Sequence, residues 1–203
     1  MKKLLLAALF ALGALTLAAH ARAGGKAADL GPRGGLLAQV DADFGGDKVA
    51  TVFFEDDSDQ DITAGQGLAL SVGGYFRPVA DSRFEIEASL GYKYATTQAS
   101  NADVHLSRTL LQLEGLYRWP NGFFMGAGLM HHLGPTIHGD GFFEDVEFDD
   151  ASGLNVEIGW RWISLHYVNM SYTGDSALFD DDVDASHVGI RFTWRFGQPW
   201  TNR

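Results

Sequence analysis

Acidic residues crowd three segments of this chain and could bind hard cations. The segments are residues 45–66, 133–150 and 174–185, and Lys48 is the only Lys or Arg among them. Carboxylate oxygens are the ligands that Ca²⁺ and Mg²⁺ prefer. Asp57, Asp59 and Asp61 alternate as in the opening of a calcium loop, but the loop's usual sixth-position Gly and twelfth-position Glu are absent. We predict Ca²⁺ or Mg²⁺ binding at Asp56, Asp57, Asp59 and Asp61, and the alternative is a solvated loop surface that holds no ion.

A second set of charges stands at alternate positions of otherwise apolar runs. Residues 83–95 are an example, because Glu85, Glu87 and Lys93 alternate there with Phe, Ile, Leu and Tyr. Opposite charges on one face could form a network of ion pairs, or they could line a conduit. The residues that we expect in this network are Glu85, Glu87, Lys93, Glu114, Arg118, Glu157, Arg161, Arg191 and Arg195.

The alternation predicts eight β-strands, because side chains of a strand point to opposite faces with a period of two. The predicted strands are residues 36–44, 67–77, 83–95, a fourth that ends at Trp119, 123–132, 153–162, 165–173 and 187–196. Short turns are expected at residues 78–82, 120–122 and 163–164, and long loops at the other connections. Lengths of about 9 to 12 residues suit tilted strands that cross a bilayer.

The apolar faces are predicted to point outward, into lipid. In the last strand, Val188, Ile190 and Phe192 alternate with His187, Gly189 and Arg191. Burying so many charges in an apolar core would cost several kcal/mol per ion, whereas a closed barrel in lipid turns them inward. The fold class is therefore an all-β, antiparallel, up-and-down transmembrane barrel of eight strands. Its interior is only just wide enough for side chains, which favours ion pairing over conduction.

Two further expectations follow from this orientation. On the seventh strand we place His166, Val168, Met170 and Tyr172 outward. Aromatic residues should form belts at the two membrane interfaces. The belt at the short turns would contain Phe84, Trp119, Phe123, Trp160, Trp162, Trp194 and Phe196, and the other belt would contain Phe44, Tyr92, Tyr94 and Tyr172.

The N-terminus has the pattern of a secretory signal peptide. Lys2 and Lys3 precede an apolar run over residues 4–17, which is too short to span a bilayer. Ala21-Arg22-Ala23 has the pattern of a cleavage site, and Ala19-His20-Ala21 is the alternative. We divide the chain into a signal peptide, residues 1–23, and a barrel domain, residues 24–203. The formal net charge of −11 disfavours binding to nucleic acid, and the absence of cysteine excludes disulfides.

The signal peptide, the alternating strands and a last strand that ends Phe192-Thr193-Trp194-Arg195-Phe196 resemble the small outer-membrane barrels typified by OmpX, OmpW and the OmpA membrane domain. The resemblance implies Sec-type export, assembly by the barrel-assembly machinery, and a monomer in contact with outer-membrane lipid and lipopolysaccharide. One departure is that residues 197–203 follow Phe196, which is where such chains usually end.

Three functions remain open, and the first is a non-enzymatic structural or surface-binding role in the cell envelope. The second is a narrow conduit for small molecules. The third is a lipid A-modifying enzyme, because His166-Tyr167-Val168-Asn169 resembles the His-x-Ser-Asn motif of outer-membrane deacylases. Val168 stands where that motif has its Ser, and Ser171 is expected on the opposite face from His166. No catalytic or cofactor-binding residue is therefore predicted.

Overall fold

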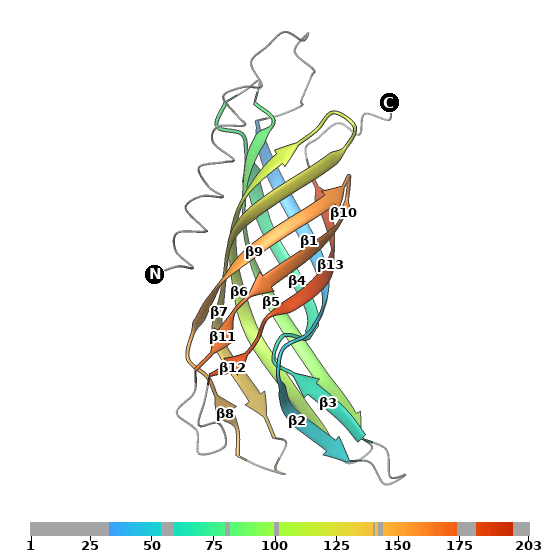
Figure 1. Cartoon of the computed structure of the whole chain (residues 1–203), viewed down its shortest axis with the longest axis vertical. Helices are drawn as coiled ribbons and strands as arrows, with labels where there is room; N and C mark the ends of the chain where they lie inside the picture. Colours follow the sequence, from blue (N-terminus) through green and yellow to red (C-terminus); the bar gives the residue numbers. More distant parts are fainter. Residues whose placement is uncertain are drawn as a thin grey trace.

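The chain folds as a closed barrel in which every strand runs antiparallel to its neighbours (Figure 1). The computed structural model describes residues 33–53, 59–79, 82–99, 102–139, 141, 144–173 and 182–196. Each barrel strand pairs with the next in the chain, and the last pairs with the first. The eight barrel strands are β1 (Gly34–Phe44), β4 (Gly67–Phe76), β5 (Phe84–Ala99), β6 (Ala102–Arg118), β7 (Phe123–His138), β9 (Ala151–Trp160), β10 (Ile163–Asn169) and β13 (His187–Arg195).

This arrangement confirms the predicted eight-stranded, up-and-down antiparallel barrel. The predicted signal peptide, residues 1–23, lies outside the described residues. Within the described part of the chain, no helix has the length and apolar character needed to cross a membrane.

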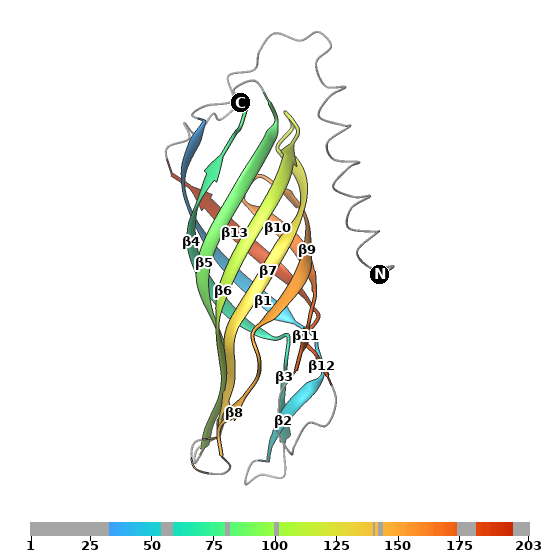
Figure 2. The same ribbon diagram turned by 90° about the vertical axis from the view of Figure 1, so that its left-hand side faces the viewer.

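Short strands extend the barrel at the end opposite the short turns, the lower end of Figure 1. β2 and β3 form a hairpin within the first predicted loop, β8 pairs with β7, and β11 pairs with β12. Figure 2 shows β5, β6 and β7 running on to this end, so these strands are longer than the sequence predicted. The short strands are β2 (Lys48–Phe53), β3 (Asp59–Thr63), β8 (Val146–Glu147), β11 (Ser171–Tyr172) and β12 (Val183–Asp184).

The barrel is apolar outside and charged inside, as predicted. The side chain of Leu70 on β4 is 67% exposed, whereas Lys93 on β5 and Arg191 on β13 are fully buried. This distribution is the reverse of a soluble barrel, and it is the one that transmembrane barrels adopt, because their outer surface contacts lipid.

The predicted facing of the seventh strand was wrong. His166 and Val168 on β10 point inward, and Leu165 and Tyr167 point outward. The cause is the register of the β9–β10 hairpin, in which Leu165 lies directly opposite Ile158 on β9. Residues directly opposite in an antiparallel pair share a face, so the outward Ile158 fixes Leu165 outward. The hairpin turns at residues 161–162, not at residues 163–164.

Several exposed aromatic residues lie near the ends of the strands. Trp160, Trp194 and Phe196 are exposed at the short-turn end and Phe44 at the other end, whereas Tyr92 is exposed near the middle of β5. The prediction was wrong for Tyr172, which is completely buried, because it continues the inward face of β10. Tyr167, on the outward face of β10, is the exposed tyrosine of this part of the chain.

A compact apolar cluster, which we call the cap, fills the barrel interior at the end that carries the short strands. Its side chains come from β3 and from the ends of the barrel strands, together with β8, β11 and β12. The cap gives the protein a conventional hydrophobic core beyond the charged lumen. It consists of Ile62, Ala64, Ala95, Val104, Leu106, Met130, Ile137, Val146, Phe148, Ala151, Val168, Met170, Tyr172, Val183 and Ala185.

Candidate functional site in the barrel lumen

The middle of the lumen is built around one guanidinium group. Arg191 binds Asp41 through two parallel contacts, Nε to Oδ1 at 2.8 Å and Nη2 to Oδ2 at 2.9 Å. Its Nη1 atom donates to Glu157 Oε2 at 2.9 Å and to Glu114 Oε2 at 3.4 Å. Asn155 Nδ2 donates to the other oxygen of Glu114. The five side chains come from β1, β6, β9 and β13, so one buried cation links strands on different sides of the barrel.

A second charged group lies on the short-turn side of the first. Arg118 donates from Nε to Glu85 Oε1 at 2.8 Å and from Nη2 to Glu87 Oε1 at 2.9 Å. Arg195 contacts both glutamates, and Arg77 Nε lies 3.7 Å from Glu85 Oε2. Three arginines thus surround two buried carboxylates, whereas around Arg191 three carboxylates surround one arginine.

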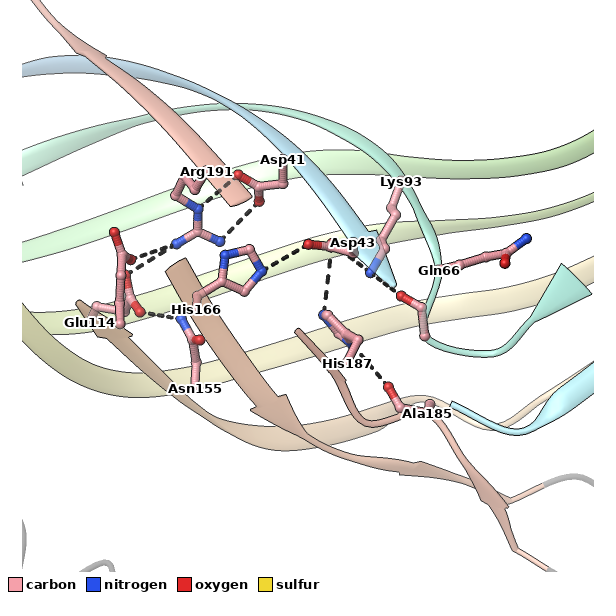
Figure 3. Close-up of polar contacts among 12 residues, drawn as sticks. Asp41, Asp43, Gln66, Lys93, Glu114, Asn155, His166, Ala185, His187 and Arg191 are labelled. Atoms are coloured by element: carbon pink, nitrogen blue, oxygen red, sulfur yellow. Dashed lines mark hydrogen bonds and ion pairs between the residues drawn. The ribbon is translucent and has the colours of Figure 1, made fainter. Parts of the chain in front are cut away.

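A third group lies between the Arg191 network and the cap, and it is centred on Asp43 of β1 (Figure 3). Lys93 Nζ lies 2.7 Å from Asp43 Oδ2 and also donates to the carbonyl oxygen of Gly65 at 2.7 Å. His166 Nε2 lies 2.9 Å from Asp43 Oδ1, and His187 Nε2 lies 3.8 Å from Oδ2. All four ionisable side chains are buried. We call Asp43, His166 and His187 the histidine site.

Further polar side chains connect the histidine site to the cap. His132 Nδ1 lies 2.6 Å from the hydroxyl oxygen of Tyr172. The His132 ring stacks against the His187 ring, and the two ring centroids are 6.0 Å apart. Arg108 Nη2 donates to the carbonyl oxygen of Gln66 at 2.7 Å. Tyr172 belongs to the cap, so the polar lumen and the apolar cluster meet at this residue.

Most of the charged residues that the sequence placed in the lumen do lie there, and they form three separate groups of ion pairs. Glu114, Glu157 and Arg191 form one, and Glu85, Glu87, Arg118 and Arg195 form another. Lys93 pairs with Asp43 in the third. Arg161 is not in the lumen. It lies exposed in the β9–β10 turn with a positive φ of 57°, and its guanidinium stacks over the Trp160 ring at 4.4 Å.

Sequence reasoning missed the histidine site. Asp43 and His187 were on inward faces in the alternation, but His166 was assigned to the lipid face. A correct register for β10 would have placed His166 beside the other two residues. The pairing of β13 with β1 sets Gly189 directly opposite Asp43, and no local pattern in the sequence shows that pairing.

Of the predicted cation-binding residues, only Asp61 has a described side chain. Asp56 and Asp57 lie outside the described residues, and only the backbone of Asp59 is described, in β3. Asp61 Oδ2 lies 2.6 Å from Lys48 Nζ, and its Oδ1 accepts from Thr51 Oγ1 at 2.7 Å. These hydrogen bonds lower the pKa of Asp61, and the one from Lys48 has a larger effect than the one from Thr51. Asp61 on β3 therefore links the two strands of the hairpin through side-chain contacts with β2.

We expect the Asp61 contacts to make the stability of the β2–β3 hairpin decrease in acid but not at neutral pH. A carboxyl whose folded pKa is lowered stabilises the fold above its unfolded pKa, and this contribution is lost as the pH falls through the folded pKa. Amide exchange in the β2–β3 hairpin should therefore show constant protection from about pH 7 to 4 and lose it in stronger acid. Asp61→Asn should remove the pH-dependent part. The same acid profile in Asp61→Asn would contradict this role.

The residues that resemble the deacylase motif do not form a catalytic pair. His166 points into the lumen, and Ser171 lies exposed outside, so the prediction that they occupy opposite faces is confirmed. A different pair, His131 Nδ1 and Ser152 Oγ at 2.8 Å, lies on the outer surface between β7 and β9. His132 points inward, so the two adjacent histidines lie on opposite faces of β7.

Comparison with known proteins gives likenesses of fold only. No protein-family model and no curated protein matches the chain. One similar structure is Ail, the attachment invasion locus protein of Yersinia pestis, at 8% identity and a TM-score of 0.40, covering 79% of this chain and 97% of Ail. Ail in complex with the heparin analogue sucrose octasulfate gives 8% identity, the same coverage and a TM-score of 0.41. The N-terminal β-barrel domain of Pseudomonas aeruginosa OprF gives 11% identity and a TM-score of 0.33, covering 81% of this chain and 99% of that domain.

Proposed function

We propose that this protein is an integral outer-membrane barrel that does not conduct and has a structural or surface-binding role in the cell envelope. The apolar outer face supports a position in the membrane. Closed antiparallel barrels with apolar exteriors, polar interiors and aromatic belts are the β-structures that span bacterial outer membranes. The signal-peptide pattern of residues 1–23 agrees with export to that compartment.

The observation that carries the proposal is the filling of the lumen. Arg191 is completely buried among carboxylates from strands on different sides of the barrel. Toward the end that carries the short strands, the interior is closed by the apolar cap. A narrow conduit would need a continuous polar path, and ion-paired side chains followed by an apolar cluster do not provide one.

Conductance in planar bilayers tests the proposal. The refolded full chain should give no steady current steps under conditions in which a 16-stranded porin, which has an aqueous channel, does. Insertion is checked separately by protection of the barrel from added protease. Current steps of reproducible size from the inserted protein would overturn the non-conducting assignment and favour the conduit.

The orientation of the barrel follows from the lengths of its connections. Outer-membrane barrels place short turns in the periplasm and long loops outside the cell, so the turn at residues 120–122 should be periplasmic and residues 140–150 extracellular. Protease added to whole cells should cut within residues 140–150 and spare residues 120–122. Cleavage near Asn121 in intact cells would reverse this orientation.

The proposed surface role belongs to the acidic loops. Their carboxylates face an outer leaflet that is itself anionic, and divalent cations could bridge the two. Ca²⁺ binding at Asp56, Asp57, Asp59 and Asp61 stays a prediction, with an affinity comparable to the ~10⁻⁴–10⁻³ M of weak extracellular sites. Calorimetry in lipopolysaccharide-containing membranes should show heat of Ca²⁺ binding that decreases when the four residues become Asn. Equal heats of Ca²⁺ binding in the wild type and in this variant would show that the four residues do not form a Ca²⁺ site.

A further inference from the structure

The histidine site has the ligand set of a transition-metal centre inside the barrel. One carboxylate oxygen of Asp43 and one ring nitrogen each of His166 and His187 lie within 4.8 Å of one another, and all three residues are buried. They come from β1, β10 and β13, which are neighbours across the barrel closure. Two imidazoles and a carboxylate suit zinc, whereas Ca²⁺ and Mg²⁺ take all-oxygen sites.

The hydrogen bonding of His187 leaves one ring nitrogen directed at Asp43. His187 Nδ1 lies 2.9 Å from the carbonyl oxygen of Ala185. Because a carbonyl can only accept, Nδ1 carries the hydrogen, and Nε2 of the neutral ring presents its lone pair. His187 Nε2 is buried and has no hydrogen-bond partner among the described residues. A backbone carbonyl that fixes the tautomer is the usual outer-shell partner of a metal-binding histidine.

The distances fit a small ion. Zinc bonds to nitrogen and oxygen of about 2.0–2.2 Å in a tetrahedron place ligand atoms roughly 3.3–3.5 Å apart. Asp43 Oδ1 lies 2.9 Å from His166 Nε2 and Asp43 Oδ2 lies 3.8 Å from His187 Nε2, and one ligand atom from each residue lies within 4.8 Å of the other two. Small shifts of these side chains would bring the three atoms to the spacing of a tetrahedral ion. A Cβ atom at Gly189 would collide with Asp43 Oδ1 and lie 2.8 Å from His166 Nε2. The absence of a side chain at Gly189 therefore leaves room for the ligand atoms of Asp43 and His166.

Two nearby features determine how the ion would be held. His132 Nε2 is also buried without a hydrogen-bond partner among the described residues, and its ring stacks on that of His187 with the centroids 6.0 Å apart, so it packs against one ligand without belonging to the group of three. Lys93 Nζ lies 2.7 Å from Asp43 Oδ2. This ammonium is a cation that competes with a metal for the same carboxylate.

We propose that Asp43, His166 and His187 bind one divalent transition-metal ion, of which zinc is the best match, as a structural centre that fastens β1, β10 and β13 together. The role is structural because the ligands are buried beneath the cap, where a substrate would have no path to the ion. The site is separate from the predicted Ca²⁺ site in the acidic loops. It also does not depend on whether the barrel conducts.

Metal analysis of the refolded full chain, prepared without a polyhistidine tag, tests the proposal. After chelation, incubation with ZnCl₂ and dialysis, the wild type should retain one zinc per chain by mass spectrometry. His166→Ala and His187→Ala should each lower the affinity at least 100-fold, more than the 10–100-fold that loss of an outer-shell partner costs. Because the site is buried, zinc is supplied both during refolding and afterwards.

Matched variants separate this site from others. His131→Ala, on the lipid face, and His138→Ala, which removes the exposed His138–Asp145 pair, should keep the zinc. Lys93→Met should raise the affinity by removing the competing cation, and this test remains if the histidine variants fail to fold. Cobalt in place of zinc should give the intense visible bands of a tetrahedral site. Equal zinc in the wild type and in folded His166→Ala or His187→Ala, loss of zinc in His138→Ala, or unchanged affinity in Lys93→Met would overturn the proposal.

Discussion

Replacing Arg191 by methionine should destabilise the barrel by about 3–5 kcal/mol, the cost of removing one partner from a buried ion pair. Arg191 is fully buried, and its guanidinium contacts Asp41, Glu114 and Glu157. Without it, three carboxylates face one another with no cation among them. Urea unfolding of the refolded protein in lipid, followed by tryptophan fluorescence, measures the free energy of unfolding.

Arg161→Met is the matched control, because it makes the same chemical change at an exposed turn. Arg161 stacks over the Trp160 ring at 4.4 Å, and an exposed contact of this kind is worth about 0.5–1 kcal/mol. In a double-mutant cycle, Asp41→Asn should recover part of the loss in Arg191→Met, since the two residues interact directly. Equal losses in Arg191→Met and Arg161→Met would show that the network does not stabilise the fold.

Placing arginine on the outer face at Leu90 should cost about 2–4 kcal/mol, the value for a charge at the bilayer midplane. Leu90 lies in the middle of β5, directly opposite Val72 and Leu111, and its side chain is 52% exposed. If the outer face met water, such an exposed position would tolerate arginine within about 0.5 kcal/mol. Unfolding in lipid vesicles therefore reports on the surroundings of this residue.

Val79→Arg provides the comparison for Leu90→Arg. Val79 is 59% exposed, close to the value for Leu90, but it lies in the turn between β4 and β5. An arginine near the membrane interface costs only about 0–1 kcal/mol. A similar cost at both positions would mean that Leu90 does not face lipid, and the transmembrane assignment would fail.

The eight strands could be predicted because most of them alternate an apolar face with a face of polar or small residues. Glu85, Glu87 and Lys93 on β5, for example, mark an inward face that no other arrangement of the strand would tolerate. β10 was different, since Leu165 and Tyr167 on one face and Val168 and Met170 on the other are equally apolar. Local alternation cannot decide such a case, and the partner strand does.

The cap was not predicted because it breaks the rule that identified the barrel. Val168, Met170 and Tyr172 point inward although they are apolar, because the interior near the short strands is closed by packing and not by ion pairs. The lumen networks were predicted as a set of charges, but their partners depend on which strands meet. Asp41 and Arg191 face each other only because β1 pairs with β13.

That pairing also constrains the order in which the molecule forms. Asp41 and Arg191 are 150 residues apart in the chain, and contacts of such high sequence separation form slowly because a long loop must first be closed. Until β13 docks on β1, Asp41, Glu114 and Glu157 have no guanidinium between them, and an open sheet would carry their unneutralised charges into the bilayer. Insertion and barrel closure are therefore coupled. A chain without its last strand would lower its free energy little by entering the membrane.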